Sequence, residues 1–391
     1  MIHISRKRTV GLSSLLIVML TIAVTLSSFL LYNTVTHAAG SAYVRVNQVG
    51  YSNGETKQAV LMATGAEDGA KFSVINTSTG KSVYTAPIGG SLGSWSSTFP
   101  NTYLLDFTAV KTTGSYTIQV NGSLNASSPM FKIDSGANLY SGLLPNALFF
   151  YLAQRDGPNV DHSVMKREPS HLTDEQASIY DTPVYKHGQI QGSLHKIGGP
   201  IDVSGGWFDA GDYIKFVETA SYTDAIMLFA DRQYPNLFDG GSANFQTEGK
   251  YGLDWLQKMW DNSSQTLSYQ VGIGDGNKNI IADHDIWRLP QADDKLNVKP
   301  GDKEYYIKYR PVFRAGPPGS QISPNLAGRL TADFALCYQL YRKSDPPYAN
   351  QCLSSAENIF ALAKTSHVGQ LLTTAPYGYY PETEWRDDME L

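Results

Sequence analysis

Two aspartates three residues apart are the strongest candidates for chemistry in this sequence. Asp209 and Asp212 lie in segment 202–216, which reads DVSGGWFDAGDYIKF and has glycines on both sides of the pair. Glycine lets the backbone adopt positive φ and approach a ligand closely. If the segment turns helically, residues at i and i+3 point to one side, where two carboxylates can hold a water molecule and remove its proton. The spacing alone is equally compatible with a turn that carries two solvated aspartates.

Aromatic side chains and a histidine accompany this pair. Trp207 and Tyr213 flank the aspartates, and His284 and Trp287 lie in the later segment 283–287, which reads DHDIW. An indole ring can stack on the apolar face of a sugar ring, and an imidazole can hydrogen-bond a hydroxyl group. Packing in the protein interior is the alternative for all four side chains.

Several segments, taken in order, resemble motifs of glycoside hydrolase family 9, a family of inverting endoglucanases that cleave β-1,4-glucans. Segment 202–216 resembles the family signature with its Asp-Ala-Gly-Asp arrangement, and segment 283–287 is similar to a His-Asp-x-Trp segment of the substrate cleft. Residues 44–51 (VRVNQVGY) resemble the opening strand of an immunoglobulin-like domain that precedes many of these catalytic domains. The other matching segments are 310–313 (RPVF), 323–329 (SPNLAGR) and 380–385 (YPETEW).

The resemblance implies hydrolysis of internal β-1,4-glucosidic bonds in cellulose or related β-glucans, with inversion of configuration. By position in the family motif, Asp212 would be the general base and Asp209 would help to hold the attacking water. The expected substrate contacts are His284, Trp287, Trp207 and Tyr213, with packing beside the aspartates an equal alternative for the last two. In an inverting enzyme the acid and the base stand roughly 6.5–9.5 Å apart. Asp209 and Asp212 both belong on the base side, so they are not that pair.

The general acid of the family is a glutamate near the end of the catalytic domain, and we expect it beyond residue 391. Glu382, Glu384 and Glu390 belong to a segment that the family places elsewhere, so we do not assign them as the acid. We interpret them as acidic residues at a helix start, beside the positive end of the helix dipole. The chain then reads as a fragment with little or no hydrolytic activity of its own.

Two other functions stay open. A sandwich with part of a barrel could bind glucan without cleaving it, which predicts an affinity that survives Asp212→Asn. A family 9 enzyme of other specificity could act as a xyloglucanase, an exo-glucosidase or a glucosaminidase, and its product profile would show this. The binding function is less favoured, because half a barrel would expose a large apolar patch.

The elements that would position these residues change type once along the chain. Short runs with alternating apolar residues predict strands up to residue 134. From residue 138, apolar residues recur at helical spacing. Together with the resemblance, this predicts an immunoglobulin-like β-sandwich over residues 40–135, followed over 138–391 by an all-α (α/α)6 barrel that is incomplete here. The predicted strands are 43–48, 58–62, 72–75, 82–84, 103–107, 115–120 and 130–133, and the predicted helices are 139–155, 218–232, 248–260, 324–341 and 351–364.

The N-terminus reads as a targeting segment over residues 1–39. A basic group at 6–8 precedes an apolar stretch at 10–31, and small residues follow near Ala38, which is the pattern of a secretory signal. The apolar stretch is also long enough to span a bilayer, so an uncleaved membrane anchor is the alternative to a secreted product. Export would permit a disulfide between Cys337 and Cys352, and two buried free thiols are the equal alternative.

The net charge of the chain limits the classes of molecule that it can bind. The formal net charge of −5 is spread along the chain without a basic stripe, which argues against a nucleic-acid partner and favours a neutral substrate. We expect a monomer that has no contact with a membrane once the signal is cleaved.

No cofactor is required, and no metal is assigned. A zinc site is not expected, because the histidines of the region that binds zinc in some relatives lack neighbouring thiolates; they are His162, His171, His187 and His195. Calcium at residues 275–279 (DGNKN) is the weaker alternative to an ordinary polar loop. Ile280 and Ile286 stand where a calcium loop has its glycine and its closing glutamate.

Overall fold

The computed structural model describes residues 40–235 and 244–391. The predicted signal segment 1–39 lies outside the described residues. The chain divides into two compact units, with the boundary between Gly142 and Leu143. No helix within the described ranges is both long and apolar enough to cross a membrane.

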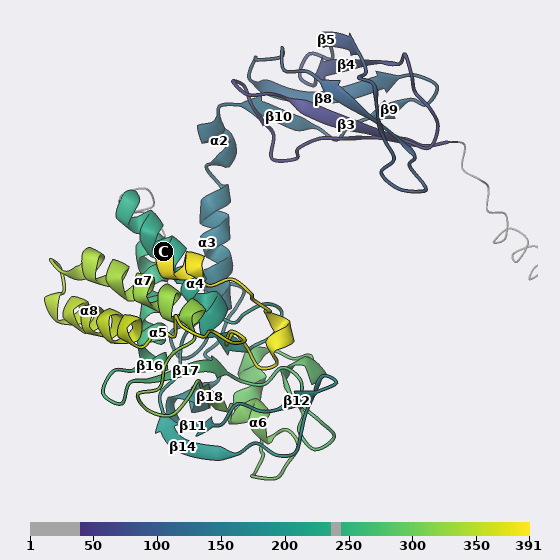
Figure 1. The fold of residues 1–391 in the computed structure, drawn as a ribbon. Coiled ribbons are helices and arrows are strands. Elements are labelled where there is room, and N and C mark those ends of the chain that lie inside the picture. The colour runs from purple at the N-terminus through teal and green to yellow at the C-terminus, as the bar shows by residue number, and fades with distance from the viewer. Residues whose placement is uncertain (1–39, 236–243) are drawn as a thin grey trace, which may run out of the picture. The chain divides into compact units, whose positions relative to one another are not determined.

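The first unit is a sandwich of two β-sheets, as predicted (Figure 1). One sheet has the strand order β1–β3–β7–β6, and the other has the order β2–β10–β8–β4–β5 with β9 paired to β8. Three strands escaped prediction, because two or three residues are too few for an alternating pattern; these are β2 (Tyr51–Ser52), β6 (Ser91–Gly93) and β9 (Ala126–Ser127). The predicted strands correspond to β1 (Ala42–Arg45), β3 (Gln58–Ala63), β4 (Lys71–Asn76), β5 (Ser82–Pro87), β7 (Asn101–Asp106), β8 (Gly114–Asn121) and β10 (Phe131–Asp134).

The two sheets share one apolar core. Leu61 of β3 and Ile118 of β8 are fully buried. The Tyr51 ring packs edge-on against Phe107 and Phe131, with centroid distances of 4.9 and 5.3 Å, a geometry that adds to the stabilisation by burial. The alternating apolar pattern therefore marks the core face of each strand.

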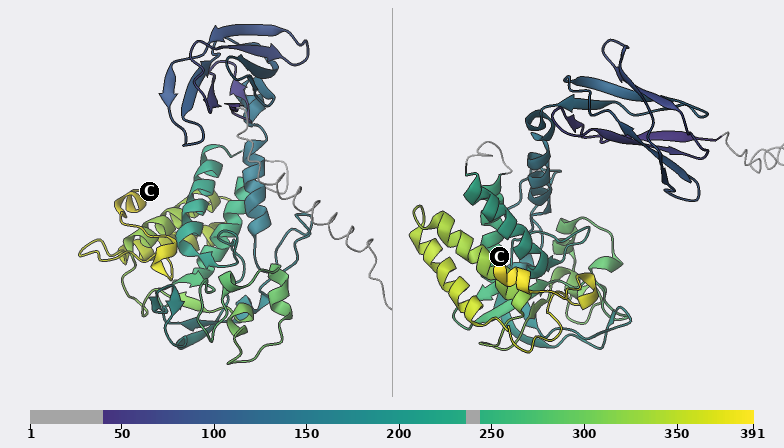
Figure 2. Two further views of the ribbon diagram at one scale, coloured as in Figure 1. Left: turned by 90° about the vertical axis from the view of Figure 1, so that its right-hand side faces the viewer. Right: turned by 45° about the horizontal axis from the view of Figure 1, so that its top comes forward.

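Long helices dominate the second unit, and each corresponds to a predicted one. Helix α4 packs against α5 and α7, and α7 packs against α8 (Figure 2). A six-hairpin barrel needs more helices than the described residues supply, so the closed barrel stays a prediction. The long helices are α3 (Leu143–Gln154), α4 (Val217–Gln233), α5 (Phe245–Met259), α7 (Pro324–Tyr341) and α8 (Pro346–Ala361), and the short ones are α2 (Gly136–Tyr140), which belongs to the first unit, α6 (Tyr305–Lys308) and α9 (Arg386–Glu390).

A mixed β-sheet lies at one end of these helices, where the sequence predicted only long loops (Figures 1 and 2). Its strand order is β14–β11–β18–β17–β15, with β16 paired to β17. The candidate site is built on segments that enter or leave this sheet. The strands are β11 (Ala177–Tyr180), β14 (Lys196–Ile201), β15 (Lys215–Phe216), β16 (Trp260–Asp261), β17 (Thr266–Val271) and β18 (Val312–Arg314), and a separate hairpin joins β12 (Tyr185–Lys186) to β13 (Gln189–Ile190).

Helices α7 and α8 are joined by a disulfide. Cys337 and Cys352 are both fully buried, and their Cα atoms are 6.1 Å apart in the bridge. The structure thus adopts one of the two alternatives that the sequence left open.

Candidate active site

The segment that carries Asp209 and Asp212 is a loop closed by its own backbone. The Asp209 N–H donates to the carbonyl oxygen of Ile214 at 2.9 Å, and the Ile214 N–H donates to the Asp212 carboxylate at 2.9 Å. The loop runs directly into β15, where Lys215 pairs with Val271 of β17. The helical turn considered for this pair is therefore wrong, and a sheet strand fixes the loop instead.

The glycines before the aspartates have the predicted backbone role. Gly205 and Gly206 have φ values of 93° and 76°, in the region that favours glycine. A Cβ atom on Gly206 would lie 2.6 Å from an indole carbon of Trp255. The chain can therefore pass this close to α5 only with glycine at that position.

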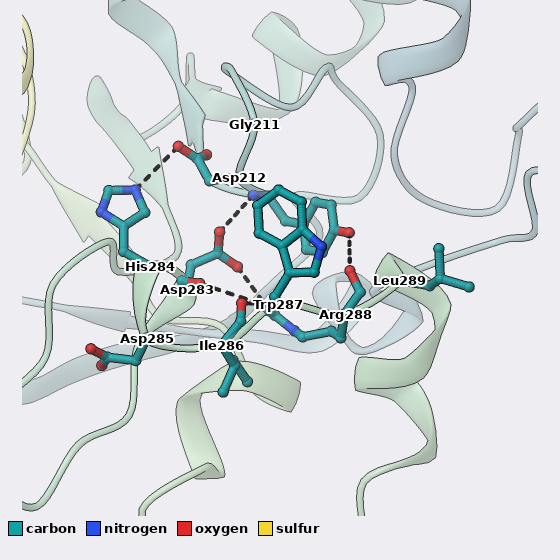
Figure 3. Close-up of a pocket in the computed structure, with 10 residues that line it drawn as sticks. Gly211, Asp212, Asp283, His284, Asp285, Ile286, Trp287, Arg288 and Leu289 are labelled. Carbon is teal, nitrogen blue, oxygen red and sulfur yellow. Dashed lines mark hydrogen bonds and ion pairs between the residues drawn. The ribbon is translucent and has the colours of Figure 1, made fainter. Parts of the chain in front are cut away.

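A pocket of about 590 Å³ opens beside Asp212. Four of the six predicted site residues line it: Asp212, Tyr213, His284 and Trp287. The Trp287 side chain is 95% exposed, so the faces of its ring are available to a ligand (Figure 3). The structure thus brings together two segments that are about seventy positions apart in the sequence.

Trp207 does not line this pocket. It is only 5% exposed, and its indole N–H donates to Glu248 at 3.3 Å. Its ring packs against Tyr151 and Tyr251 with centroid distances of 5.6 and 6.1 Å. The predicted substrate contact of Trp207 is therefore corrected to a packing role.

Asp209 is held from two sides next to the pocket. One carboxylate oxygen accepts the hydroxyl of Thr219 at 2.8 Å, and the other accepts the hydroxyl of Tyr380. Burial raises the pKa of Asp209 and the nearby Asp212 charge adds to the rise, although both hydrogen bonds oppose it. Thr219 was not predicted, and Tyr380 entered the sequence analysis only as part of a matching segment.

His284 lies between two carboxylates, which the sequence did not predict. Its Nε2 is 3.2 Å from an oxygen of Asp212 (Figure 3), and its Nδ1 is 3.3 Å from an oxygen of Asp275. The hydrogen bond to Asp212 is the largest cause that raises the pKa of His284 to about 9. At neutral pH the ring is therefore an imidazolium that forms an ion pair with Asp212.

Asp283 and Arg288 fix the backbone and side chain of Tyr213. The Tyr213 N–H donates to Asp283 at 2.7 Å, and its hydroxyl donates to the Arg288 carbonyl oxygen. The Arg288 guanidinium pairs with Asp283 at 2.8 Å and with Asp293 at 2.7 Å. Tyr213 thus lines the pocket with its hydroxyl already bound to protein.

A buried charge cluster braces the loop from inside the unit. Lys215 pairs with Asp156 and Asp174 at 3.0 Å each, and Arg310 pairs with the same two aspartates. Arg310 also donates to the carbonyl oxygen of Tyr213. Because every member is nearly inaccessible to solvent, the cluster ties the loop to the core with interactions that water cannot replace.

The loop considered for calcium does not present free oxygen ligands. Asp275 accepts the hydroxyl of Tyr379 at 2.6 Å, and the Asn277 side chain donates to two backbone carbonyl groups and accepts the Asn279 N–H. No group of three or more His, Cys, Asp or Glu side chains that could hold a metal ion occurs in the described part of the chain. These contacts favour the ordinary polar loop, and calcium at residues 275–279 stays a prediction.

The three late glutamates do not line the pocket. Glu382 pairs with Arg329 at 2.5 Å, and the exposed Glu384 pairs with Arg386 at 2.8 Å. Since α9 begins at Arg386, Glu382 belongs to an ion cluster rather than to the predicted helix start. Glu390 lies in α9 and is exposed.

Comparisons with known proteins match both units. Residues 140–391 match the model of glycosyl hydrolase family 9, and residues 39–124 match the cellulase N-terminal ig-like domain. The chain is 27% identical over 258 residues to Endoglucanase 17 of Arabidopsis thaliana, which covers 63% of this chain and 41% of that protein. It is 29% identical over 231 residues to a xyloglucan-specific endo-β-1,4-glucanase of Bacteroides ovatus, covering 56% of this chain and 36% of that protein.

A solved structure shows the same fold. The crystal structure of the GH family 9 endoglucanase J30 superimposes with a TM-score of 0.57 at 25% identity, covering 79% of this chain and 52% of that one. The chain thus spans about half, or less, of the length of these relatives. Since the match to the first family model alone extends over residues 140–391 of the 391-residue chain, the chain belongs to glycosyl hydrolase family 9.

Proposed function

We propose that this chain carries the base side of the active site of an inverting endo-β-1,4-glucanase that acts on cellulose or related β-glucans. One observation carries the proposal: Asp212, whose carboxylate is bound by the loop backbone and by His284, lines a pocket together with Trp287, which is 95% exposed. A neutral sugar chain suits this site, because Trp287 offers a flat apolar face and Asp212 offers an acceptor for a proton.

In this proposal Asp212 removes a proton from water as the water oxygen bonds to the anomeric carbon. Asp209, on the same loop, helps to hold that water from the base side. The leaving oxygen departs from the opposite face of the sugar and takes a proton from a general acid. His284 lies 3.2 Å from the Asp212 carboxylate and holds its orientation in the pocket.

The acid is not assigned to another carboxylate of the pocket. Asp283 is paired with Arg288, and Asp285 accepts the backbone N–H of Ala282 at 2.8 Å. We propose a glutamate that follows residue 391 in a longer protein. We propose that the protein is secreted, because residues 1–39 read as a secretory signal. We also propose that it is a monomer.

Product release from a soluble cellulose derivative tests endo action. Internal cleavage lowers the viscosity of carboxymethylcellulose early, when few reducing ends have formed. Release of glucose or cellobiose with little loss of viscosity would instead show exo action. Xyloglucan is the second candidate substrate, because one relative is named as specific for it, and a higher kcat/KM on xyloglucan than on cellulose would favour it.

We expect Trp287→Ala to weaken the binding of soluble cello-oligosaccharides by about 10- to 100-fold. Burial of an aromatic side chain contributes about 1.5–3 kcal/mol, and this contribution is lost with the ring. Thermal stability should not change, since the side chain is 95% exposed. Isothermal titration calorimetry measures the change. Trp95→Ala, which removes a tryptophan that is 73% exposed in the first unit, is the matched control, and equal affinities in the two variants would place the glucan elsewhere.

A further inference from the structure

The contacts of the His284 ring nitrogen that faces away from Asp212 identify two more residues of the site. We propose that Asp275 and Tyr379 are positioning residues, which hold the His284 imidazolium against Asp212 and so keep the base correctly oriented. This inference rests on the proposed role of Asp212 and adds the residues that control its partner.

Backbone pairing brings Asp275 next to His284. The His284 N–H donates to the carbonyl oxygen of Gly274 at 3.0 Å, and the Asp283 N–H donates to that of Ile273 at 2.9 Å. These two hydrogen bonds align segment 273–275, which follows β17, with the 3-10 turn Asp283–Asp285. The relative position of His284 and Asp275 is therefore fixed by the backbone rather than by the side chains alone.

The positions of the two ring nitrogens select the protonated form of His284. Nε2 faces Asp212 at 3.2 Å, and Nδ1 faces Asp275 at 3.3 Å. A neutral imidazole has one N–H donor and one lone pair, whereas the imidazolium has two donors. In the neutral ring one nitrogen lone pair would face a carboxylate, so both contacts are favourable only when the ring carries its positive charge.

Tyr379 holds the other oxygen of Asp275. Its hydroxyl donates to that oxygen at 2.6 Å, and its ring lies 5.3 Å from the His284 ring, centroid to centroid. A Cβ atom on Gly274 would stand 2.2 Å from the Tyr379 hydroxyl oxygen, so glycine at 274 leaves the space that this hydroxyl occupies. The hydroxyl therefore sits in a space formed for it, and it prevents the Asp275 carboxylate from turning away from His284.

Adjacent tyrosines thus support both aspartates of the loop. Tyr379 acts on Asp212 through Asp275 and His284, and Tyr380 donates directly to Asp209. Burial raises the pKa of Tyr379, and the hydrogen bond with Asp275 raises it further. The phenol accordingly stays a proton donor over the whole range in which glycosidases are assayed.

The pH dependence follows from the groups around His284. Asp212, Asp275 and Tyr379 contact it, and Asp209 acts from farther away. Because the pKa of His284 is raised to about 9, the stability contributed by its ion pairs is fully present below the pKa of an unfolded histidine and is lost as pH rises through about 9. Removal of the Asp275 charge should make His284 lose its proton at a lower pH.

Titration of the His284 ring by NMR in the full chain tests the proposal. We expect a pKa near 9 in the wild type and a decrease of at least about one pH unit in Asp275→Asn, since an adjacent opposite charge shifts a pKa by about 1–3 units. Tyr379→Phe should give a smaller decrease. Asp181→Asn is the matched control, because Asp181 pairs at 2.6 Å with His195, an exposed histidine of the same unit, and it should leave His284 unchanged.

Two outcomes would contradict the positioning role without contradicting the role of Asp212 as the base. An unchanged His284 pKa in Asp275→Asn would overturn the positioning role while leaving Asp212 as the base. If Asp275→Asn does not fold, Tyr379→Phe retains the ring, and an unchanged titration in that variant would overturn the proposal equally. In an enzyme that carries its general acid, Asp275→Asn should lower kcat with little change in KM, and an unchanged kcat would count against the proposal.

Discussion

Replacement of Asp212 by asparagine should lower kcat by about 100- to 10,000-fold, the usual contribution of a general base. Asparagine has nearly the same shape and can still accept the Ile214 N–H that now reaches the carboxylate at 2.9 Å. It cannot take a proton from water, so the chemical step is lost while the pocket keeps its form. The measurement is kcat and KM on a soluble β-glucan, in a protein that also supplies the general acid.

Asp209→Asn separates the two roles within the loop. Both Asp209 oxygens already accept hydroxyl groups, from Thr219 and Tyr380, so this change should cost less than Asp212→Asn. Asp181→Asn, at an exposed pair far from the pocket residues in sequence, should leave kcat unchanged. If Asp209→Asn proved the more damaging variant, the assignments of base and water-holding residue would have to be exchanged.

Arg310→Met should destabilise the second unit by about 3–5 kcal/mol, the usual cost of removing one partner from a buried ion pair. The Arg310 side chain is 4% exposed and pairs with Asp156 and Asp174. Methionine fills part of the space but leaves two buried carboxylates with Lys215 as their shared cation. Urea denaturation followed by tryptophan fluorescence measures the loss.

Arg386→Met is the matched control for this prediction. Arg386 pairs with Glu384 in a contact whose side chains are 68% and 56% exposed, and an exposed ion pair contributes only about 0–1 kcal/mol. A similar loss of stability in both variants would show that the buried cluster does not brace the loop.

Periodicity explains which elements the sequence predicted. The seven long strands of the sandwich and the five long helices each repeat their apolar pattern over enough residues to be recognised. The sheet of the second unit could not be found in this way, because its strands lack an alternating pattern and their partners are distant. Strand β17 is buried at five consecutive positions, and β14 contains two glycines and a proline. Lys215 of β15 pairs with Val271, and Ile179 of β11 pairs with Val312. Pairings over such separations depend on the folded chain and leave no local pattern.

The same limit applies to the candidate site, because local motifs predicted only part of it. Local motifs placed Asp212, Tyr213, His284 and Trp287 around one pocket. The sequence left Trp207 open between a substrate contact and packing, because a tryptophan beside the aspartates reads the same whether its indole faces solvent or donates to a buried glutamate.

The sequence also did not predict the hydrogen-bond partners of the site side chains. Tyr379 meets Asp275, and Tyr380 meets Asp209, only after the chain has folded. The one local signal was the matching segment 380–385, which begins with Tyr380 and directly follows Tyr379.

The configuration of the first sugar released tests most directly whether Asp212 acts as a base on water. Proton NMR of the anomeric hydrogen, recorded before mutarotation, distinguishes the two products. Direct attack by water opposite the leaving oxygen converts a β bond into an α product, so we expect the α anomer first. Initial release of the β anomer would mean that a covalent glycosyl intermediate forms, and it would contradict the role of Asp212 as a general base.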